Sequence, residues 1–534
     1  MKNETEKRQG DSVAKGATYL TLSVLIVKII GFVYKLPISY LIGDEGMGYF
    51  NTAYTVFSFF YLICTGGVPK AVSLLVAGER AKGREERALC VLVRSARVFS
   101  LVGAALSFLL LLFGGTIAGL VGNGNATFSL LCIAPSLLFV ASGGVLRGYL
   151  NGEMRLREIA VASLLEGVFK FILGLGFALL GVRLGFDIPL ISGLTILGIS
   201  VSSFISAAAL YLFCRKSLRA GKKLKRIADF DGIMPSLLKI ALPITLSCGL
   251  SGVSGMIDLS LIMRRLASLG IGELEASALY GNYTTLALPL ISFAASMLVP
   301  ISTACAPLVA SSYAKGDYGA VRENVSKFFN AMLLFAVPLT LGFLFFAEEI
   351  LTVLFEDNSA LIATPLLQAL SPSVLLLSAL TLINTFLEAL GRTKSALLSM
   401  CVGCLVKITL SYILIGKEEI SILGAPISTT VSYAVSMILS ALMLYFAVGG
   451  KLSVGSSCVR ITLAALVSVG SARALYLAIS PTDVSLGALL ICVILCVVCY
   501  FALAFLLGAF DVETNDFMSN ITKNRVNNWK KGRN

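Results

Sequence analysis

The chain consists largely of apolar runs of about 20 residues or more, separated by short polar connections. A run of that length is what an α-helix needs to cross the hydrocarbon core of a bilayer. The pattern predicts fourteen such helices, which start near residues 17, 50, 91, 126, 159, 189, 236, 277, 324, 362, 396, 421, 457 and 484. We therefore expect an all-α polytopic membrane protein.

The composition supports the same class. Hydrophobic residues make up 57% of the 534 positions and charged residues 14%, which is too little polar surface to cover a soluble globule of this size. The longer connections are the amino tail, the stretch from Arg215 to Pro235, and the carboxyl tail after Asp511. None of them has room for a soluble catalytic domain, so we do not expect an enzyme.

The net charge of +13 is explained by its distribution rather than by a nucleic acid partner. If both termini are cytoplasmic, most of the 43 Lys and Arg residues lie on inner connections and tails, as the positive-inside rule requires. The exceptions on outer connections are Arg183, Arg264, Arg265, Lys417 and Arg473. The basic run from Arg215 to Arg226 is expected to be an inner loop near anionic lipid, and a specific lipid or protein contact is the alternative.

Short segments repeat along the chain. Residues 134–138 match residues 371–375 at an offset of 237, which also superposes Lys170 on Lys407, and residues 81–83 match residues 314–316 at an offset of 233. The matches predict two six-helix lobes in parallel orientation, related by a pseudo-twofold axis along the membrane normal. The expected organisation is a lobe at 1–214, a basic linker at 215–235, a lobe at 236–450, two extra helices at 451–510 and a cytoplasmic tail at 511–534.

Lysines lie deep in several of these helices. Lys28, Lys170 and Lys407 are near the midpoints of apolar segments, where a charge is costly unless it faces a protein-lined, wet interior. Lys35 lies two turns after Lys28 on the same helix face, although it is also close enough to the outer end to snorkel. Lys70 follows Gly66-Gly67-Val68-Pro69, which weakens the helix locally, and snorkelling is again the alternative.

Three acidic residues accompany the lysines. Glu166 precedes Lys170 by four residues, so the two charges lie side by side on a helix, either as a structural pair or as a coupling or gating pair. Lys407 could likewise be paired with an acidic group on a neighbouring helix. Asp258 and Glu388 are nearer to helix ends, where placement at the membrane interface is favoured over a gating role.

Deep amines suit an anionic ligand such as phosphate or diphosphate, because a desolvated ammonium group needs a compensating negative charge. An exporter of cations would instead bury carboxylates. The chain has 12 cysteines and no histidine, and the pairs Cys401/Cys404 and Cys496/Cys499 lie on membrane helices. Neither a metal site nor a cofactor is therefore expected.

Several segments together resemble the oligosaccharide and polysaccharide flippases of the MATE-like (MOP) superfamily, most closely its stage V sporulation protein B branch, which is related to the lipid II flippases. The resemblance covers most of the chain. It is carried by Lys28-Ile-Ile-Gly31-Phe-Val-Tyr-Lys35, Ile42-Gly-Asp-Glu-Gly46, Gly66-Gly-Val-Pro69, Arg147-Gly-Tyr-Leu-Asn-Gly152, Glu166 with Lys170, Ala278-Leu-Tyr-Gly281 and Leu298-Val-Pro-Ile-Ser302.

The resemblance implies two six-helix lobes around a cationic cavity that opens alternately to either side, with the extra helices accommodating a lipid tail. Lys28, Lys35 and Lys170 would contact the diphosphate of an undecaprenyl-linked sugar. The chain departs from the family pattern at two places: Leu74 stands where a serine precedes the usual helix 2 lysine, with the charge at Lys70 instead, and Glu388 replaces a common Gln. Rival functions are cation-coupled multidrug export and non-transporting assembly of the envelope or spore coat. We expect a monomer.

Overall fold

The computed structural model describes residues 2–224, 232–355, 357–450, 455–480 and 485–508. In these ranges the regular elements are helices and no strand occurs. Eleven helices are long and apolar enough to cross a membrane, or up to 12 if one bent pair counts as a single span. The all-α polytopic class is therefore confirmed, whereas the count of fourteen spans stays a prediction. Parts of the predicted linker at 215–235 and the whole predicted tail at 511–534 lie outside the described residues.

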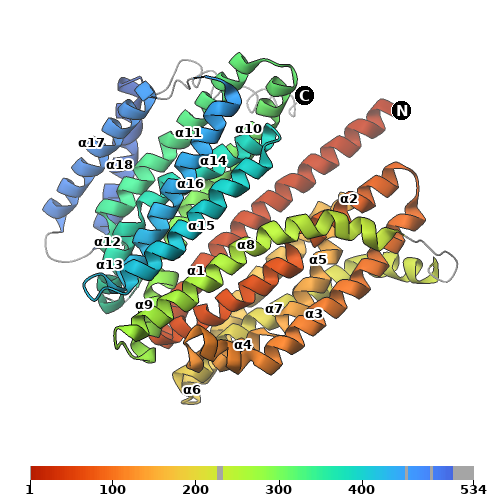
Figure 1. The fold of residues 1–534 in the computed structure, drawn as a ribbon, viewed down its shortest axis with the longest axis horizontal. Coiled ribbons are helices and arrows are strands. Elements are labelled where there is room, and N and C mark those ends of the chain that lie inside the picture. Colours follow the sequence, from red (N-terminus) through yellow and green to blue (C-terminus); the bar gives the residue numbers. More distant parts are fainter. Residues whose placement is uncertain (1, 225–231, 356, 451–454, 481–484, 509–534) are drawn as a thin grey trace. The chain divides into compact units, whose positions relative to one another are not determined.

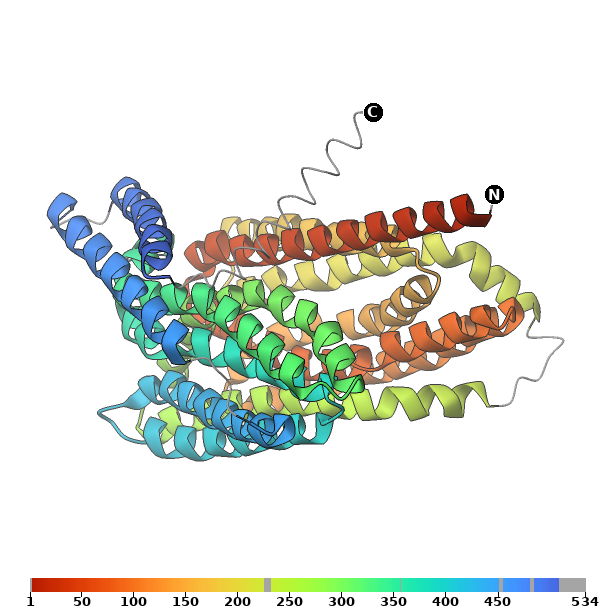
Figure 2. The same cartoon turned by 90° about the horizontal axis from the view of Figure 1, so that it is seen from above.

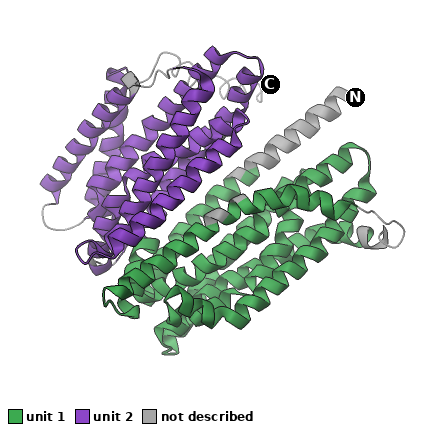
Figure 3. Ribbon diagram, in the orientation of Figure 1, with its two compact units in different colours: residues 1–285 green, residues 286–534 purple. Residues whose placement is uncertain are grey.

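The chain forms two compact units, residues 1–285 (unit 1) and 286–534 (unit 2), coloured separately in Figure 3. Figures 1 and 2 show the helices of each unit packed side by side. The elements of unit 1 are α1 (Lys2–Thr65), α2 (Val68–Ala81), α3 (Glu85–Val121), η1 (Gly124–Ala126), α4 (Thr127–Ile133), α5 (Ser136–Gly152), α6 (Leu156–Arg183), α7 (Ile188–Leu224), α8 (Ile233–Ser268) and α9 (Glu273–Asn282).

The elements of unit 2 follow a short π-helix, η2 (Tyr283–Ala287), that spans the unit boundary. They are α10 (Leu288–Ala314), α11 (Tyr318–Phe345), α12 (Ala347–Leu354), α13 (Asp357–Leu370), α14 (Pro372–Ala389), α15 (Thr393–Ile415), η3 (Ser421–Leu423), α16 (Gly424–Val448), α17 (Gly455–Ile479) and α18 (Leu486–Leu506). The compact units thus divide the chain after α9, whereas the predicted lobes divide it before α8.

The long helix α1 consists of two segments. Gly43 has φ 65° and ψ −177°, a backbone conformation that breaks the helix and that residues with a Cβ rarely adopt. The expected helices starting near residues 17 and 50 therefore both fall on α1, one on each side of Gly43. Tyr34 lies on the segment before this break and Tyr54 on the segment after it, and both segments belong to unit 1.

A second break follows at Gly66 and Gly67, where α1 ends and α2 begins at Val68. The predicted local weakening of the helix is confirmed. Close packing explains why glycine is needed here, because a Cβ on Gly67 would lie 2.1 Å from the carbonyl oxygen of Ala241 on α8. The break therefore also lets α8 approach the backbone of unit 1 closely.

Polar contacts fasten α9 and η2 to the second segment of α1. The Asn282 amide donates to the Asp44 carboxylate at 3.0 Å, the Asn51 amide donates to the Thr285 hydroxyl at 2.6 Å, and the hydroxyls of Thr55 and Tyr280 lie 3.0 Å apart. These bonds fix the position of η2, and with it a backbone carbonyl that contacts the candidate site.

The predicted repeat has local structural counterparts. Ala81 and Ala314 each end a helix, and the glycines two residues later, Gly83 and Gly316, have φ 71° and 73°. The matched Pro-Ser pairs, at 135–136 and 372–373, stand where α5 and α14 begin. These agreements support an internal repeat.

The two helices beyond the predicted repeat, α17 and α18, pack within unit 2. Ile461, Ala464 and Ala465 of α17 and Tyr500 and Ala504 of α18 belong to the same buried apolar cluster as residues of α11 and α14. The Tyr500 hydroxyl donates to the Leu334 carbonyl of α11 at 2.7 Å. The pair is therefore part of the folded unit.

Candidate functional site

The ammonium group of Lys170, on α6, is enclosed by aromatic rings from both segments of α1. Its Nζ lies 5.4 Å from the ring centroid of Tyr34 and 5.3 Å from that of Tyr54. Tyr34 is 2% exposed, and its hydroxyl donates to the Thr195 carbonyl of α7 at 3.4 Å, which holds the ring in place. Two rings at this distance stabilise a cation by the electrostatic attraction of their faces. The faces of two rings thus surround the amine of Lys170 in an apolar part of the chain.

Lys35 adds a second cation to the same place. Its Nζ donates to the carbonyl oxygen of Thr284 in η2 at 3.1 Å, and the side chain is half-buried. Lys35 and Lys170 are near enough for their charges to interact repulsively. Two partly desolvated ammonium groups in this arrangement favour an anion between or beside them.

Glu166 forms its ion pair with Arg147 of α5. The Arg147 guanidinium contacts the Glu166 carboxylate directly and also donates to the Ser206 hydroxyl of α7 at 3.0 Å. Ser206 in turn donates to the Ala162 carbonyl of α6 at 3.1 Å. Glu166 additionally attracts Lys170 at longer range. The i, i+4 spacing therefore brings Glu166 and Lys170 into electrostatic contact, while the direct partner of the carboxylate is an arginine from another helix.

Two adjoining cavities in unit 1 are lined by these groups. The first, of about 210 Å³, is lined by Lys170, Tyr54, Phe57, Ser58, Ile199 and Ser202; we term it the Lys170 cavity. The second, of about 190 Å³, is lined by Arg147, Thr65, Pro69, Phe139, Gly143, Gly144, Ser206 and Ala207; we term it the Arg147 cavity. Tyr61, Val140, Glu166 and Ser203 line both. The carboxylate of Glu166 thus stands at the wall shared by the two spaces.

Unit 2 carries no such charge pair at the matching positions of the repeat. At the offset of 237, Arg147 corresponds to Asn384 and Glu166 to Gly403. Gly403 is packed so closely that a Cβ would lie 1.8 Å from the Ser436 hydroxyl, and Asn384 accepts a hydrogen bond from Ser440 at 2.8 Å. The charged pair is therefore not repeated at these positions of unit 2.

The other predicted site residues line neither cavity. Lys28 is exposed on α1 and Lys70 is exposed at the start of α2, whereas Asp258 is half-buried on α8. Lys407, half-buried on α15, and Glu388, exposed at the end of α14, belong to unit 2. Of the predicted residues, the structure brings together Lys35, Glu166 and Lys170. The roles of all eight stay predictions.

Sequence reasoning missed Arg147 and the three tyrosines at positions 34, 54 and 61. In the sequence Arg147 stands out only as the first residue of the family-like segment 147–152, and the structure places it inside α5. The available signal was its position three helical turns after Ser136, still within the apolar run. The tyrosines carry no sequence signal that distinguishes a cation-facing ring from an ordinary core ring. Within the described ranges, no group of three or more Cys, Asp or Glu residues could hold a metal ion.

Comparison with known proteins agrees with this architecture. The family model described as polysaccharide biosynthesis protein matches residues 13–313, more than half of the chain. The chain belongs to the polysaccharide biosynthesis protein family. The MatE family model matches residues 266–413, so the expected resemblance to the MATE-like superfamily is confirmed.

Two curated proteins are similar to this chain over most of its length. Stage V sporulation protein B of Bacillus subtilis (strain 168) is 25% identical over 422 residues, which cover 78% of this chain and 80% of that protein. Lipid II flippase MurJ of the same organism is 22% identical over 451 residues, 80% of this chain and 82% of that protein. A solved structure titled lipid II flippase MurJ, inward closed conformation, is 16% identical, covers 92% of this chain and 98% of that chain, and has a TM-score of 0.71, which shows a shared fold.

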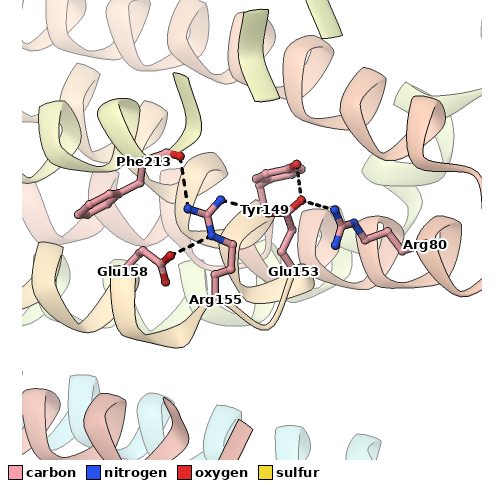
Figure 4. Close-up of polar contacts among 6 residues, drawn as sticks. All are labelled: Arg80, Tyr149, Glu153, Arg155, Glu158 and Phe213. Atoms are coloured by element: carbon pink, nitrogen blue, oxygen red, sulfur yellow. Dashed lines mark hydrogen bonds and ion pairs between the residues drawn. The ribbon is translucent and has the colours of Figure 1, made fainter. Parts of the chain in front are cut away.

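A second charged cluster of this protein lies where α2, α5, α6 and α7 meet (Figure 4). The side chain of Glu153 is 6% exposed and is contacted by Arg80 at 2.8 Å and by Arg155 at 3.3 Å. Arg155 also donates to Glu158 at 3.0 Å and to the Phe213 carbonyl at 3.5 Å. Figure 4 shows Tyr149 hydrogen-bonded to the same carboxylate. The charges in this cluster compensate one another, so it joins helices rather than forming a ligand site.

A buried ion pair connects α17 to α12 in unit 2. Glu349 is 4% exposed and contacts Arg473, whose guanidinium carbon lies 5.6 Å from the ring centroid of Phe346 and 6.0 Å from that of Tyr476. Arg473 was expected on an outer connection, but it lies inside α17. Its contacts attach the first of the two extra helices to unit 2.

Proposed function

We propose that the protein is a flippase that moves a lipid-linked, diphosphate-bearing oligosaccharide or peptidoglycan precursor across the cytoplasmic membrane by alternating access. The observation that carries this proposal is the cation cluster in unit 1. Lys35, Lys170 and Arg147 are three basic side chains beside the one carboxylate of Glu166, so two positive charges are left over when both lysines are protonated. A diphosphate is the lipid headgroup component whose charge would compensate them.

The relatives supply the transport class. Stage V sporulation protein B and lipid II flippase MurJ are similar to this chain over most of their length, and the second name describes a lipid flippase. The proposed substrate, a glycan on an undecaprenyl diphosphate carrier, agrees both with that transport class and with the positive charge of the site. Fourteen spans in two parallel lobes, both termini in the cytoplasm, a monomeric state and the absence of enzymatic activity belong to the same proposal.

Net flux needs a driving force besides binding. Among the described residues, no group of three or more Cys, Asp or Glu could hold a metal ion, and the carboxylate of Glu166 is engaged by Arg147. We therefore propose that the membrane potential, acting on the moving anionic headgroup, drives transport, with a cation gradient as the alternative.

The test is reconstitution of the protein in vesicles and measurement of how fast a fluorescent undecaprenyl-diphosphate sugar becomes accessible on the opposite leaflet under an imposed potential. Protein-dependent flipping supports the proposal. Folded protein that flips none of several such lipids would overturn it.

A second candidate function, cation-coupled drug export, is favoured by the MatE match over residues 266–413. It requires a cavity that attracts organic cations, whereas the cavity charges in unit 1 are predominantly positive. Resistance of cells to organic cations that depends on this protein, together with absent lipid flipping, would support export. A stable complex with synthases and no transport of either kind would instead support the assembly role.

A further inference from the structure

The Arg147 cavity differs in chemistry from the adjoining Lys170 cavity. Its one cation and one anion, Arg147 and Glu166, neutralise each other, so it offers hydrogen-bonding groups without net charge. The remaining polar lining comes from Ser203, Ser206, Thr65 and Tyr61, and the apolar lining includes the Phe139 ring. Two of these hydroxyls already donate within the protein, Thr65 to the Tyr61 carbonyl and Ser206 to the Ala162 carbonyl, and can still accept. Neutral donors and acceptors beside aromatic faces are the groups that bind a sugar, whose ring presents both hydroxyls and C–H faces.

The size of the cavity sets a limit on what it can hold. Its volume of about 190 Å³ is below the range of about 300–1,000 Å³ that is typical of cavities for drug-sized ligands. This is room for one sugar ring and not for an oligosaccharide. A longer glycan would have to extend beyond the cavity.

One donor of Arg147, a residue that lines this cavity, is unsatisfied. The Nε of Arg147 is buried and has no hydrogen-bond partner among the described residues, although the same guanidinium bonds to Glu166 and Ser206. An unpaired buried donor is unfavourable. A ligand oxygen could satisfy it if the guanidinium turned toward the cavity when the ligand binds. Sugar hydroxyl and acetamido oxygens are suitable acceptors.

From these observations we infer that the Arg147 cavity is the subsite for the single sugar attached directly to the diphosphate, with the diphosphate itself in the Lys170 cavity. The inference rests on the proposed flippase function. The two cavities share the wall formed by Tyr61, Val140, Glu166 and Ser203, so adjoining parts of one ligand can occupy them. The matching positions of unit 2 hold Asn384 and Gly403, so the charged lining of these cavities is not repeated there.

Two glycines allow the volume of the subsite to be reduced without changing a charged residue. A Cβ on Gly143 would meet Leu210 at 3.6 Å and one on Gly144 would meet Pro69 at 3.6 Å, both ordinary van der Waals contacts. The double variant Gly143→Ala/Gly144→Ala should therefore fold while reducing the cavity. Gly78→Ala is the matched control, because a Cβ there would have no neighbour within 4 Å and Gly78 lines neither cavity.

The experiment compares the affinities of full-length protein in nanodiscs for bare undecaprenyl diphosphate and for the same lipid bearing glucose, galactose or N-acetylglucosamine. We expect the wild type and Gly78→Ala to bind at least one sugar-bearing lipid about tenfold more tightly than the bare lipid. The double variant should lose that preference and keep its affinity for the bare lipid. Ser203→Ala, which removes one hydroxyl, should reduce the preference partially.

Two results would overturn the inference while leaving the flippase proposal intact: equal affinity of the wild type for bare and sugar-bearing lipids, or an unchanged preference in the double variant. Failure of folded wild-type protein to bind any of the four lipids would instead overturn the proposed function, and the inference with it.

Discussion

The Arg147 guanidinium is paired with the Glu166 carboxylate, 19 residues further along the chain, between α5 and α6 of unit 1. This pairing decides the charge of the candidate site. Because Glu166 compensates Arg147, it does not fully neutralise Lys170, and Lys35 and Lys170 remain as the cations available to an anionic ligand. A cavity with that charge is suited to a headgroup with two negative charges.

Glu166→Gln should destabilise the protein, because it leaves the Arg147 guanidinium partly buried beside a neutral amide. Each side chain of the pair is 29% exposed, and we expect a loss of about 1–3 kcal/mol, seen as a lower melting temperature of the purified protein. Glu323→Gln is the control, because the Glu323–Lys327 pair is exposed and should change stability by less than about 0.5 kcal/mol. Equal melting temperatures for both variants would contradict this account of the pair.

Tyr54→Leu should weaken ligand-coupled transport more than Tyr54→Phe. The phenyl ring of the second variant preserves the aromatic face above Lys170, whereas leucine removes it. A cation–π contribution of about 0.5–2 kcal/mol corresponds to a several-fold reduction in the rate of lipid flipping for Tyr54→Leu, with Tyr54→Phe close to wild type. The two variants are compared at equal amounts of folded protein in vesicles; identical rates would show that the ring face has no role.

Gly67→Ala should prevent correct packing of α8, because the added Cβ would lie 2.1 Å from the Ala241 carbonyl oxygen. The yield of folded protein in the membrane is expected to fall sharply. Gly78→Ala, in open surroundings on α2, should leave the yield unchanged or raise it, since alanine favours helix by up to about 1 kcal/mol relative to glycine. A normal yield of Gly67→Ala would mean that the close approach of α8 is not part of the folded state.

Arg473→Met should loosen the attachment of α17, because it leaves the Glu349 carboxylate buried without its partner. Loss of one member of a buried pair costs about 3–5 kcal/mol, so hydrogen exchange in α17 should accelerate markedly relative to wild type. The double variant Glu349→Met/Arg473→Met, which removes both charges, should recover much of the protection. If the double variant is no better protected than the single one, the ion pair is not what attaches the helix.

The sequence was sufficient for the fold class, for the helix break at Gly66-Gly67 and for the neighbouring positions of Glu166 and Lys170 on one helix. Apolar runs and helical spacing determine these features locally. The sequence did not reveal the direct partner of Glu166. Its i, i+4 neighbour Lys170 competes with side chains from other helices, and Arg147 of α5 is the residue that contacts the carboxylate. The same limit applies to Tyr34 and Tyr54, whose position around Lys170 depends on the break at Gly43 and on packing between helices.

The predicted lobe bounds stay predictions, while the compact units divide the chain after α9. A basic linker suggests a boundary between lobes, whereas compactness depends on contacts such as that of Gly67 with Ala241, which residue types do not reveal.

The central claim is that the cation cluster of unit 1 binds the headgroup of a translocated lipid. Its most direct test is the flipping rate of a fluorescent undecaprenyl-diphosphate sugar in vesicles containing Lys170→Ala, compared with wild type and with Lys394→Ala, which changes an exposed lysine of α15 outside both cavities. We predict that Lys394→Ala flips the lipid at the wild-type rate and that Lys170→Ala, inserted and folded to the same extent, loses protein-dependent flipping. Wild-type flipping by Lys170→Ala would contradict the claim.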